Sequence, residues 1–182
     1  MTVYNESGLC LTLPMGQHFR FADLPAYAPL SGQHLKEMDF AWIDGAKLIL
    51  LEVRSYAQMT NPLMGADFVP VKGAPAPHRF ATLVEKLTDS LLMLLAAWAG
   101  TERGALIGAD LPIAARSRMP LKLVVAVDLP ATLAVHLPAL RDKLNERMRA
   151  RLALADVASV ALIDYARLLA HPLFSSRIVA QP

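Results

Sequence analysis

The stretch KLILLEV, residues 47–53, is almost continuously apolar. Such a run between turn signals is typical of a strand buried on both faces, as in the centre of an α/β sheet. The preceding stretch, MDFAWID, leads into it through an Asp-Gly dipeptide that favours a two-residue hairpin turn. We therefore expect a hairpin over residues 36–55. Ile49, Leu51 and Val53 should pack under one helix, and Leu48 and Leu50 should be buried on the opposite face.

The apolar periodicity predicts further elements on both sides of this hairpin. Alternation over residues 9–24 indicates an N-terminal hairpin that turns around Gly16. The spacing of Thr82 and Glu85 fits a capping box at the start of a helix. The later elements expected are a helix over 82–99 that ends at Gly100, a strand over 121–129, an amphipathic helix over 136–154 and a last strand over 156–165.

Two stretches interrupt these elements. Residues 57–79 contain four prolines and two glycines, so we expect a long irregular insertion there. Residues 101–120 are expected to form a second connector. The pattern predicts a single domain, residues 1–182, whose core spans residues 36–165. Because strands alternate with helices, the expected fold is α/β, with a mixed central sheet flanked by helices.

Composition narrows the class of protein. Of 182 residues, 54% are hydrophobic and 19% are charged, which suits a sizeable core and argues against disorder. The single cysteine, Cys10, excludes an intramolecular disulfide and fits a reducing compartment. The N-terminal segment has no signal-peptide pattern, and the longest apolar run, residues 91–99, falls short of the ~20 residues that span a bilayer. These features predict a cytoplasmic protein with no membrane partner.

Charge is distributed unevenly along the chain. Residues 1–60 carry four basic and six acidic residues, whereas residues 116–151 carry eight basic and three acidic ones. A basic segment of this kind favours a polyanion such as nucleic acid, although a solvated helix face gives the same pattern. The residues expected to contact nucleic acid are Arg116, Arg118, Arg147 and Arg151.

The central hairpin brings charged residues together. With a two-residue turn at the Asp-Gly dipeptide, partner residues have numbers that sum to 89. Asp39 then faces Leu50, and Glu52 lies one diagonal step further on the same face, roughly 7–8 Å away at the backbone. Two carboxylates at that separation can converge on one divalent cation. Arg54 points to the same face, because it follows Glu52 by two residues.

An Asp before a hairpin, followed by Glu-x-Lys on the second strand, is the layout of the PD-(D/E)XK nuclease superfamily. The chain resembles this layout: MDF supplies Asp39, and LLEVRSY supplies Glu52, with Arg54 at the lysine position. The following order of helix, strand, helix and strand is similar as well. The resemblance implies a restriction-endonuclease-like mixed sheet flanked by helices, with the N-terminal hairpin added.

The resemblance also implies an activity, the hydrolysis of phosphodiester bonds in DNA or RNA with Mg²⁺ or Mn²⁺. Such hydrolysis needs a metal that polarises the phosphoryl oxygen and lowers the pKa of a bound water. By resemblance, Asp39, Glu52 and the Val53 carbonyl hold the metal. Arg54 would stabilise the charge that develops on the phosphate.

Arg54 departs from the superfamily pattern. Arginine stays protonated in proteins, so it grips a phosphate well but cannot take a proton from water. Lys36 and Lys86 are candidates to supply an amine from elsewhere, and the sequence does not choose between them. Glu6 is a further candidate, since many members of the superfamily have an upstream acid.

A second interpretation of the same residues stays open. Asp39, Glu52 and Arg54 are also able to form a structural ion cluster without metal. The chain would then be a catalytically inactive nuclease-fold domain for nucleic-acid binding or assembly. A homodimer or another protein partner is left open, because one short chain does not cut both strands at once. No histidine or cysteine spacing indicates zinc, and GxSxG, P-loop and GxGxxG motifs are absent from the sequence.

Overall fold

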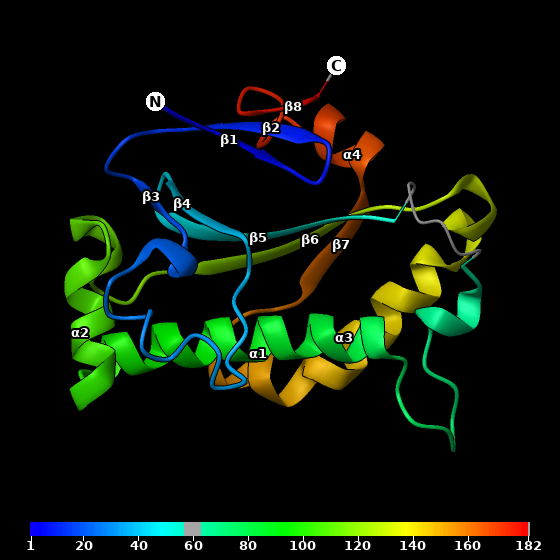
Figure 1. The fold of residues 1–182 in the computed structure, drawn as a ribbon, viewed down its shortest axis with the longest axis horizontal. Helices are drawn as coiled ribbons and strands as arrows, with labels where there is room; N and C mark the ends of the chain where they lie inside the picture. The colour runs from blue at the N-terminus through cyan, green and yellow to red at the C-terminus, as the bar shows by residue number, and fades with distance from the viewer. Residues whose placement is uncertain (57–62, 182) are drawn as a thin grey trace.

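A five-stranded mixed sheet forms the centre of the fold in the computed structural model, which describes residues 1–56 and 63–181 (Figure 1). The strands lie in the order β3-β4-β5-β6-β7. Those from β3 to β5 pair antiparallel, while β6 pairs in parallel with both β5 and β7. The bounds are β3 (His18–Phe19), β4 (Phe40–Asp44), β5 (Lys47–Ser55), β6 (Leu121–Asp128) and β7 (Val160–Asp164). The prediction of an α/β fold with a mixed sheet is confirmed.

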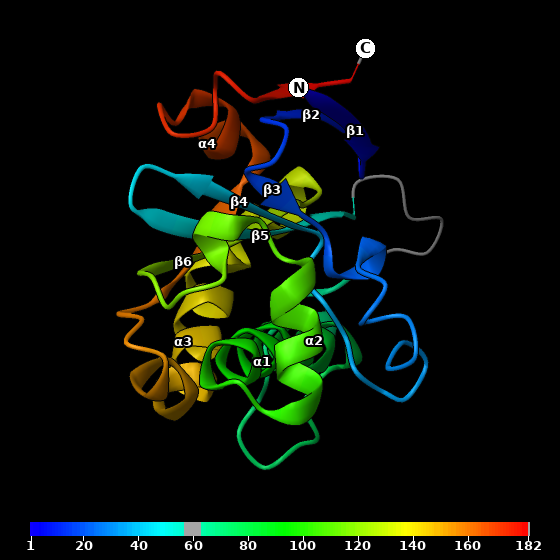
Figure 2. The same ribbon diagram turned by 90° about the vertical axis from the view of Figure 1, so that its left-hand side faces the viewer.

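Helices α1 (His78–Ala99), α2 (Glu102–Asp110) and α3 (Leu137–Leu154) lie on one face of this sheet (Figures 1 and 2). The connection from β5 to β6 contains α1, and that from β6 to β7 contains α3, as parallel strands require. None of the helices in the described part of the chain has the length and apolar character needed to cross a membrane. The short 3₁₀ segments are η1 (Phe21–Asp23), η2 (Gly65–Asp67), η3 (Ile113–Ala115) and η4 (Ala131–His136).

A smaller sheet and a short helix lie on the opposite face of the central sheet (Figures 1 and 2). The small sheet is antiparallel, with the order β1-β2-β8, and contains the strand nearest each terminus. Its strands are β1 (Thr2–Glu6), β2 (Leu9–Leu13) and β8 (Ile178–Ala180), and the helix is α4 (Tyr165–Ala170).

Strand β5 is buried on both faces, as its apolar run predicts. Leu48 and Leu50 belong to the core beneath the long helices, whereas Ile49, Leu51 and Val53 belong to the core beneath the small sheet. The alternation is therefore confirmed. The cover of the second face differs from the expected single helix, because β2, β8 and α4 together supply its apolar side chains.

The predicted hairpin over residues 9–24 is wrong. β2 pairs with β1 and β8, whereas β3 pairs with β4 in the other sheet. The N-terminal hairpin turns instead at Ser7-Gly8, whose φ angles of 51° and 80° fit the type I′ turn that joins twisted strands. Alternation located strands near the observed positions, but it carries no information on which sheet each strand joins.

Helix α1 begins at His78, directly after Pro77, and not at the predicted residue 82. The capping-box prediction is wrong, because Thr82 lies inside the helix. Its hydroxyl is buried and has no hydrogen-bond partner within the described residues. The predicted end at Gly100 is confirmed by a left-handed φ of 66°, a conformation that favours glycine.

The stretches expected to be irregular have different outcomes. Residues 101–120 contain α2, so their prediction as a connector is wrong. Thr101 accepts a hydrogen bond from the Gly104 N–H at the start of this helix. A Cβ atom on Gly104 would lie 2.2 Å from the Ala96 carbonyl oxygen, so only glycine allows α2 to pack this closely on α1. Of the insertion over 57–79, residues 57–62 lie outside the described part, and the rest holds only η2 and the start of α1.

Candidate active site

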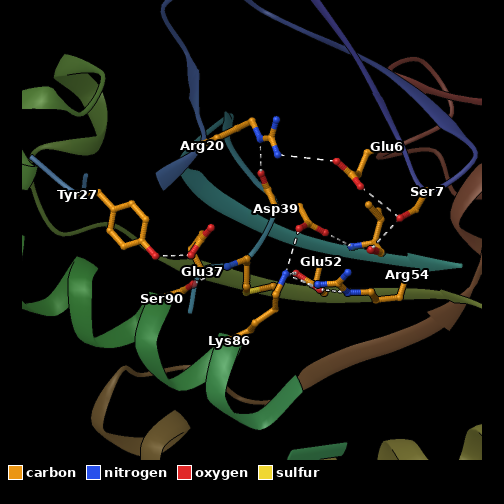
Figure 3. A network of polar contacts seen from close by, with 12 residues as sticks. Glu6, Ser7, Arg20, Tyr27, Glu37, Asp39, Glu52, Arg54, Lys86 and Ser90 are labelled. Atoms are coloured by element: carbon orange, nitrogen blue, oxygen red, sulfur yellow. Dashed lines mark hydrogen bonds and ion pairs between the residues drawn. The ribbon is translucent and has the colours of Figure 1, made fainter. Parts of the chain in front are cut away.

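The hairpin formed by β4 and β5 brings Asp39 and Glu52 together (Figure 3). Its turn lies one residue later than predicted, because Gly45, with φ of 57°, takes the first turn position. Partner residues therefore have numbers that sum to 91 and not to 89. The predicted register is wrong, but the shift of two keeps both carboxylates on the same face. Continued by one residue, this register places Asp39 opposite Glu52.

Asp39 is fixed by contacts on three sides. Its Oδ2 accepts a hydrogen bond from the Val53 N–H at 2.9 Å, and its Oδ1 lies 3.1 Å from Lys86 Nζ. Its main-chain carbonyl accepts a hydrogen bond from Arg20 Nε at 3.0 Å. The carboxylate is thus held at the end of β5, where its position is set by both backbone and side-chain groups.

Glu52 is an acid buried at the end of a core strand, with a side chain that is only 1% exposed. A carboxylate oxygen accepts a hydrogen bond from Arg54 Nε at 2.7 Å, and Lys86 Nζ donates to the same carboxylate at 2.9 Å. Burial, with the nearby Asp39 carboxylate, raises the pKa of Glu52 to about 7, although both cations lower it. Burial therefore outweighs the two cations, and the ionised carboxylate still favours additional positive charge.

Lys86 reaches this pair of acids from α1 and lies between them (Figure 3). Its side chain is 12% exposed. Of the two lysines left open by the sequence, Lys36 instead pairs with Glu85 at the surface. A signal was present in the sequence, since Lys86 and Ser90 are polar residues one turn apart on a helix that is largely apolar.

The connector before β4 is attached to α1, which fixes the distance between Lys86 and the hairpin. Ser90 Oγ accepts a hydrogen bond from the Met38 N–H, and an Asp89 carboxylate oxygen accepts one from the Lys36 N–H, both at 2.9 Å. The Tyr27 hydroxyl donates to the Glu37 carboxylate in the same segment. These bonds hold Asp39 over the helix position that carries Lys86.

Asp39, Glu52, Arg54 and Lys86 together form an ion cluster, and the N-terminal turn at Ser7 lies next to it, over the Val53 carbonyl. Ser7 Oγ lies 3.5 Å from the Val53 carbonyl oxygen and 3.4 Å from Glu6. The Tyr165 hydroxyl donates to the Ser7 carbonyl at 2.9 Å. Arg20 lies 3.8 Å from the Glu6 carboxylate. Glu6 is therefore next to the cluster, and Ser7, Arg20 and Tyr165 are neighbours that the sequence did not indicate.

The four arginines expected to bind nucleic acid fall in separate places. Arg116 donates to the Ala109 and Leu111 carbonyls at the end of α2. Arg118 forms an ion pair with Asp156. Arg147 and Arg151 lie on α3 and line a groove that α3 forms with α1. Nucleic-acid binding by these residues stays a prediction.

The cluster contains two carboxylates and two cations, so its formal charge is zero. Asp39 and Glu52, with the neighbouring Val53 carbonyl, are the oxygen donors that a divalent cation prefers. Within the described ranges, no group of three or more His, Cys, Asp or Glu residues gathers as a metal site. The arrangement is able either to exchange the Lys86 ammonium for a metal ion or to persist as a self-neutralised ion cluster.

Comparisons of this chain with protein-family models, with curated proteins and with solved structures returned no significant match. The functional argument therefore depends on the geometry of the cluster and on the chemistry of its residues.

Proposed function

We propose that this chain is a metal-dependent nuclease of the PD-(D/E)XK type, in which Lys86 takes the part of the motif lysine. One observation carries the proposal: Lys86 Nζ lies 3.1 Å from Asp39 and 2.9 Å from Glu52. A lysine from α1 therefore completes an Asp-Glu-Lys set that the sequence motif lacks, since Arg54 occupies the lysine position of that motif.

The donor set fits Mg²⁺ or Mn²⁺. Magnesium in proteins is commonly held by one or two carboxylates, with water and substrate phosphate completing its shell. Asp39, Glu52 and the Val53 carbonyl would hold it here, and it would supply Lewis acidity toward a phosphodiester. The raised pKa of Glu52 supports this assignment. Burial makes ionisation of this carboxyl unfavourable, and a bound divalent cation would stabilise its ionised form.

The two cationic side chains have different roles in this proposal. Arg54 stays protonated, and its half-buried side chain would bind a phosphate oxygen of the substrate. Lys86 would donate a hydrogen bond from Nζ to the reacting phosphate, next to the two carboxylates that it contacts. Because Arg54 retains Glu52 as a partner, Lys86 is able to move without leaving that carboxylate unpaired.

The topology supports a restriction-endonuclease-like core. The acidic hairpin β4-β5 is followed by α1, α2, β6, α3 and β7, and β5 joins β6 in parallel beside the site. The polyanion substrate in this proposal is DNA or RNA. The small sheet β1-β2-β8 is an addition that closes the face of β5 away from α1.

The zero formal charge of the ion cluster favours a second candidate function, one without catalysis. Lys86 and Arg54 already compensate both carboxylates, and such an arrangement is stable without metal. In that case the chain is a catalytically inactive nuclease-fold module for nucleic-acid binding or assembly. The two functions differ in whether a divalent cation displaces Lys86 and supports hydrolysis.

Hydrolysis of labelled single-stranded DNA, duplex DNA and RNA, each with Mg²⁺, Mn²⁺ or EDTA, tests the proposal. We expect cleavage of at least one substrate that requires metal. Glu52→Gln and Lys86→Ala should remove it, whereas Lys36→Ala, which alters a surface lysine, should leave it unchanged. Absence of cleavage by wild type on all three substrates would favour the inactive module.

A further inference from the structure

A pocket of about 470 Å³ lies next to the candidate active site, between the N-terminal hairpin, strand β3 and the end of α2. Its volume is within the range of small-ligand sites. The side chains that matter most for recognition are those of Tyr4, His18, Arg20, Asp23 and Arg116, and Leu24, Leu111 and Ile113 contribute apolar surface.

Arg20 connects this pocket to the candidate active site. Its Nε donates to the Asp39 carbonyl at 3.0 Å, while its guanidinium carbon lies 5.0 Å from the ring centre of Phe40 and 5.6 Å from that of Tyr4. The contact with Glu6, at 3.8 Å, is too long for a hydrogen bond. The guanidinium is thus held in a defined plane at the edge of the pocket, which suits a phosphate oxygen pair.

Tyr4 and His18 form a second recognition element in the pocket. His18 Nδ1 lies 2.7 Å from the Pro14 carbonyl, which only accepts, so Nδ1 carries the proton in the neutral ring. His18 Nε2 then accepts the hydrogen bond from the Tyr4 hydroxyl at 3.0 Å. Because the Tyr4 proton is directed to His18, the Tyr4 oxygen faces a ligand as an acceptor. It would select a donor such as the exocyclic amine of a nucleobase.

The charges of the pocket suit one nucleotide better than a polyphosphate. Two arginines, Arg20 and Arg116, and two aspartates, Asp23 and Asp110, line the pocket, and Glu6 lies 3.8 Å from Arg20. Asp110 also accepts a hydrogen bond from the Ala26 N–H. A single phosphate near Arg20, with donor groups near Tyr4 and Asp23, matches this arrangement. The Ile113 side chain, which is 83% exposed, is available to the face of a base, whereas Leu24 and Leu111 are buried beneath the pocket.

We propose that this pocket binds the nucleotide adjacent to the scissile phosphate, with its phosphate on Arg20 and its amino-bearing base near Tyr4. The inference rests on the proposed nuclease function and extends it. It gives the substrate class as a strand whose base is unpaired, because a paired base stays stacked in the duplex and does not enter a pocket.

Titration of adenosine 5′-monophosphate into the full chain in EDTA, followed by nuclear magnetic resonance, tests the pocket independently of hydrolysis. We expect saturable shifts at the His18 and Ile113 backbone amides. Arg20→Gln should weaken the affinity about tenfold, the effect of losing a charge-assisted bond. Arg177→Gln is the matched control, because Arg177 has a similar exposure and a single ion pair to Asp44.

Tyr4→Phe separates nucleotide recognition from anion binding. It should weaken adenosine 5′-monophosphate several-fold and leave inorganic phosphate unchanged. Equal binding of phosphate and nucleotide, with no effect of Tyr4→Phe, would overturn the inference. So would metal-dependent cleavage by a protein that shows no nucleotide shifts in the pocket, and in that case the nuclease proposal stands alone. Nucleotide binding in the pocket without cleavage supports the pocket and counts against the nuclease.

Discussion

Glu52 contacts two cations, and yet its pKa rises to about 7 because the side chain is buried next to Asp39. At the scale of single residues, the main feature of the candidate site is the free-energy cost of ionising the Glu52 carboxyl in the core. Lys86 and Arg54 offset part of that cost, and a proton or a divalent cation would offset more. The sequence identified Asp39, Glu52 and Arg54. The sequence did not distinguish Lys86 from Lys36, because the distinction depends on which side of α1 faces the β4-β5 hairpin.

The raised pKa of Glu52 predicts a pH dependence of stability. The ordinary value of this carboxyl is 4.5, so between pH 4.5 and about 7 the folded state retains a proton that the unfolded state loses. The free energy of unfolding of the metal-free protein should fall as pH rises through this window, by about 3 kcal/mol at most. Urea denaturation of wild type and Glu52→Gln at several pH values measures it. The free energy of unfolding of wild type minus that of Glu52→Gln should decrease from pH 4.5 to about 7, and a value that stays constant or increases contradicts the assignment.

Removing the ammonium of Lys86 should expose the mutual repulsion of the two acids. Lys86→Met is expected to lower the free energy of unfolding at pH 8 by about 3–5 kcal/mol at most, because Asp39 loses the Lys86 ammonium and Glu52 keeps only Arg54 as a cationic partner. Saturating Mg²⁺ should recover part of the loss. Lys36→Met, which alters an exposed pair, should cost less than about 1 kcal/mol. If Mg²⁺ leaves the stability of Lys86→Met unchanged, the carboxylates do not form a metal site.

At the scale of elements, the best predictions came from long and consistent patterns. The continuous apolar run of β5 identified a strand buried on both faces, and the glycine after α1 marked its end. The strands near the N-terminus were found without their partners, because alternation is the same in both sheets. Helix α2 was missed because Gly104 and Gly108 lower its helix propensity, and packing against α1 overrides that preference.

Gly104 should be intolerant of a side chain, whereas Gly108 on the same helix should tolerate one. A Cβ on Gly104 would meet the Ala96 carbonyl at 2.2 Å, but the nearest atom to a Cβ on Gly108 is 3.5 Å away. Gly104→Ala is expected to destabilise the fold by about 1–3 kcal/mol or more. Gly108→Ala should be neutral or stabilise it by up to about 1 kcal/mol. Thermal denaturation compares them, and equal effects would contradict the close packing of α2 on α1.

At the scale of the whole molecule, the candidate site lies where three parts of the chain meet. The hairpin β4-β5 supplies the acids, α1 supplies Lys86, and the turn at Ser7 lies over the Val53 carbonyl. A sequence pattern predicts each of these elements separately, but their contact with one another depends on tertiary packing. Arg116 lies at the end of α2, Arg118 pairs with Asp156, and Arg147 and Arg151 line the groove between α3 and α1. The number of basic residues in this segment of the sequence therefore does not imply one continuous basic surface.

Nucleic-acid binding should nevertheless depend on salt and on the basic face of α3. The double variant Arg147→Glu/Arg151→Glu is expected to weaken binding of any sequence and to reduce the salt slope by about one per lost phosphate contact. Arg141→Glu, a reversal elsewhere on α3 at a residue paired with Asp142, should have a smaller effect. Filter binding over a range of salt measures both variants. Affinity that is indifferent to salt, or equal in the two, rules out this face as the phosphate contact.

The central claim is that Asp39 and Glu52 form a divalent-cation site. In the metal-free protein, the Lys86 ammonium occupies the position of the cation. Anomalous diffraction from a crystal soaked in Mn²⁺ tests it most directly. The account predicts a peak between the two carboxylates, with the Lys86 ammonium displaced from between them, and no peak in a Glu52→Gln crystal. A Mn²⁺-soaked wild-type crystal with Lys86 still bridging Asp39 and Glu52, and no anomalous density beside them, would contradict it.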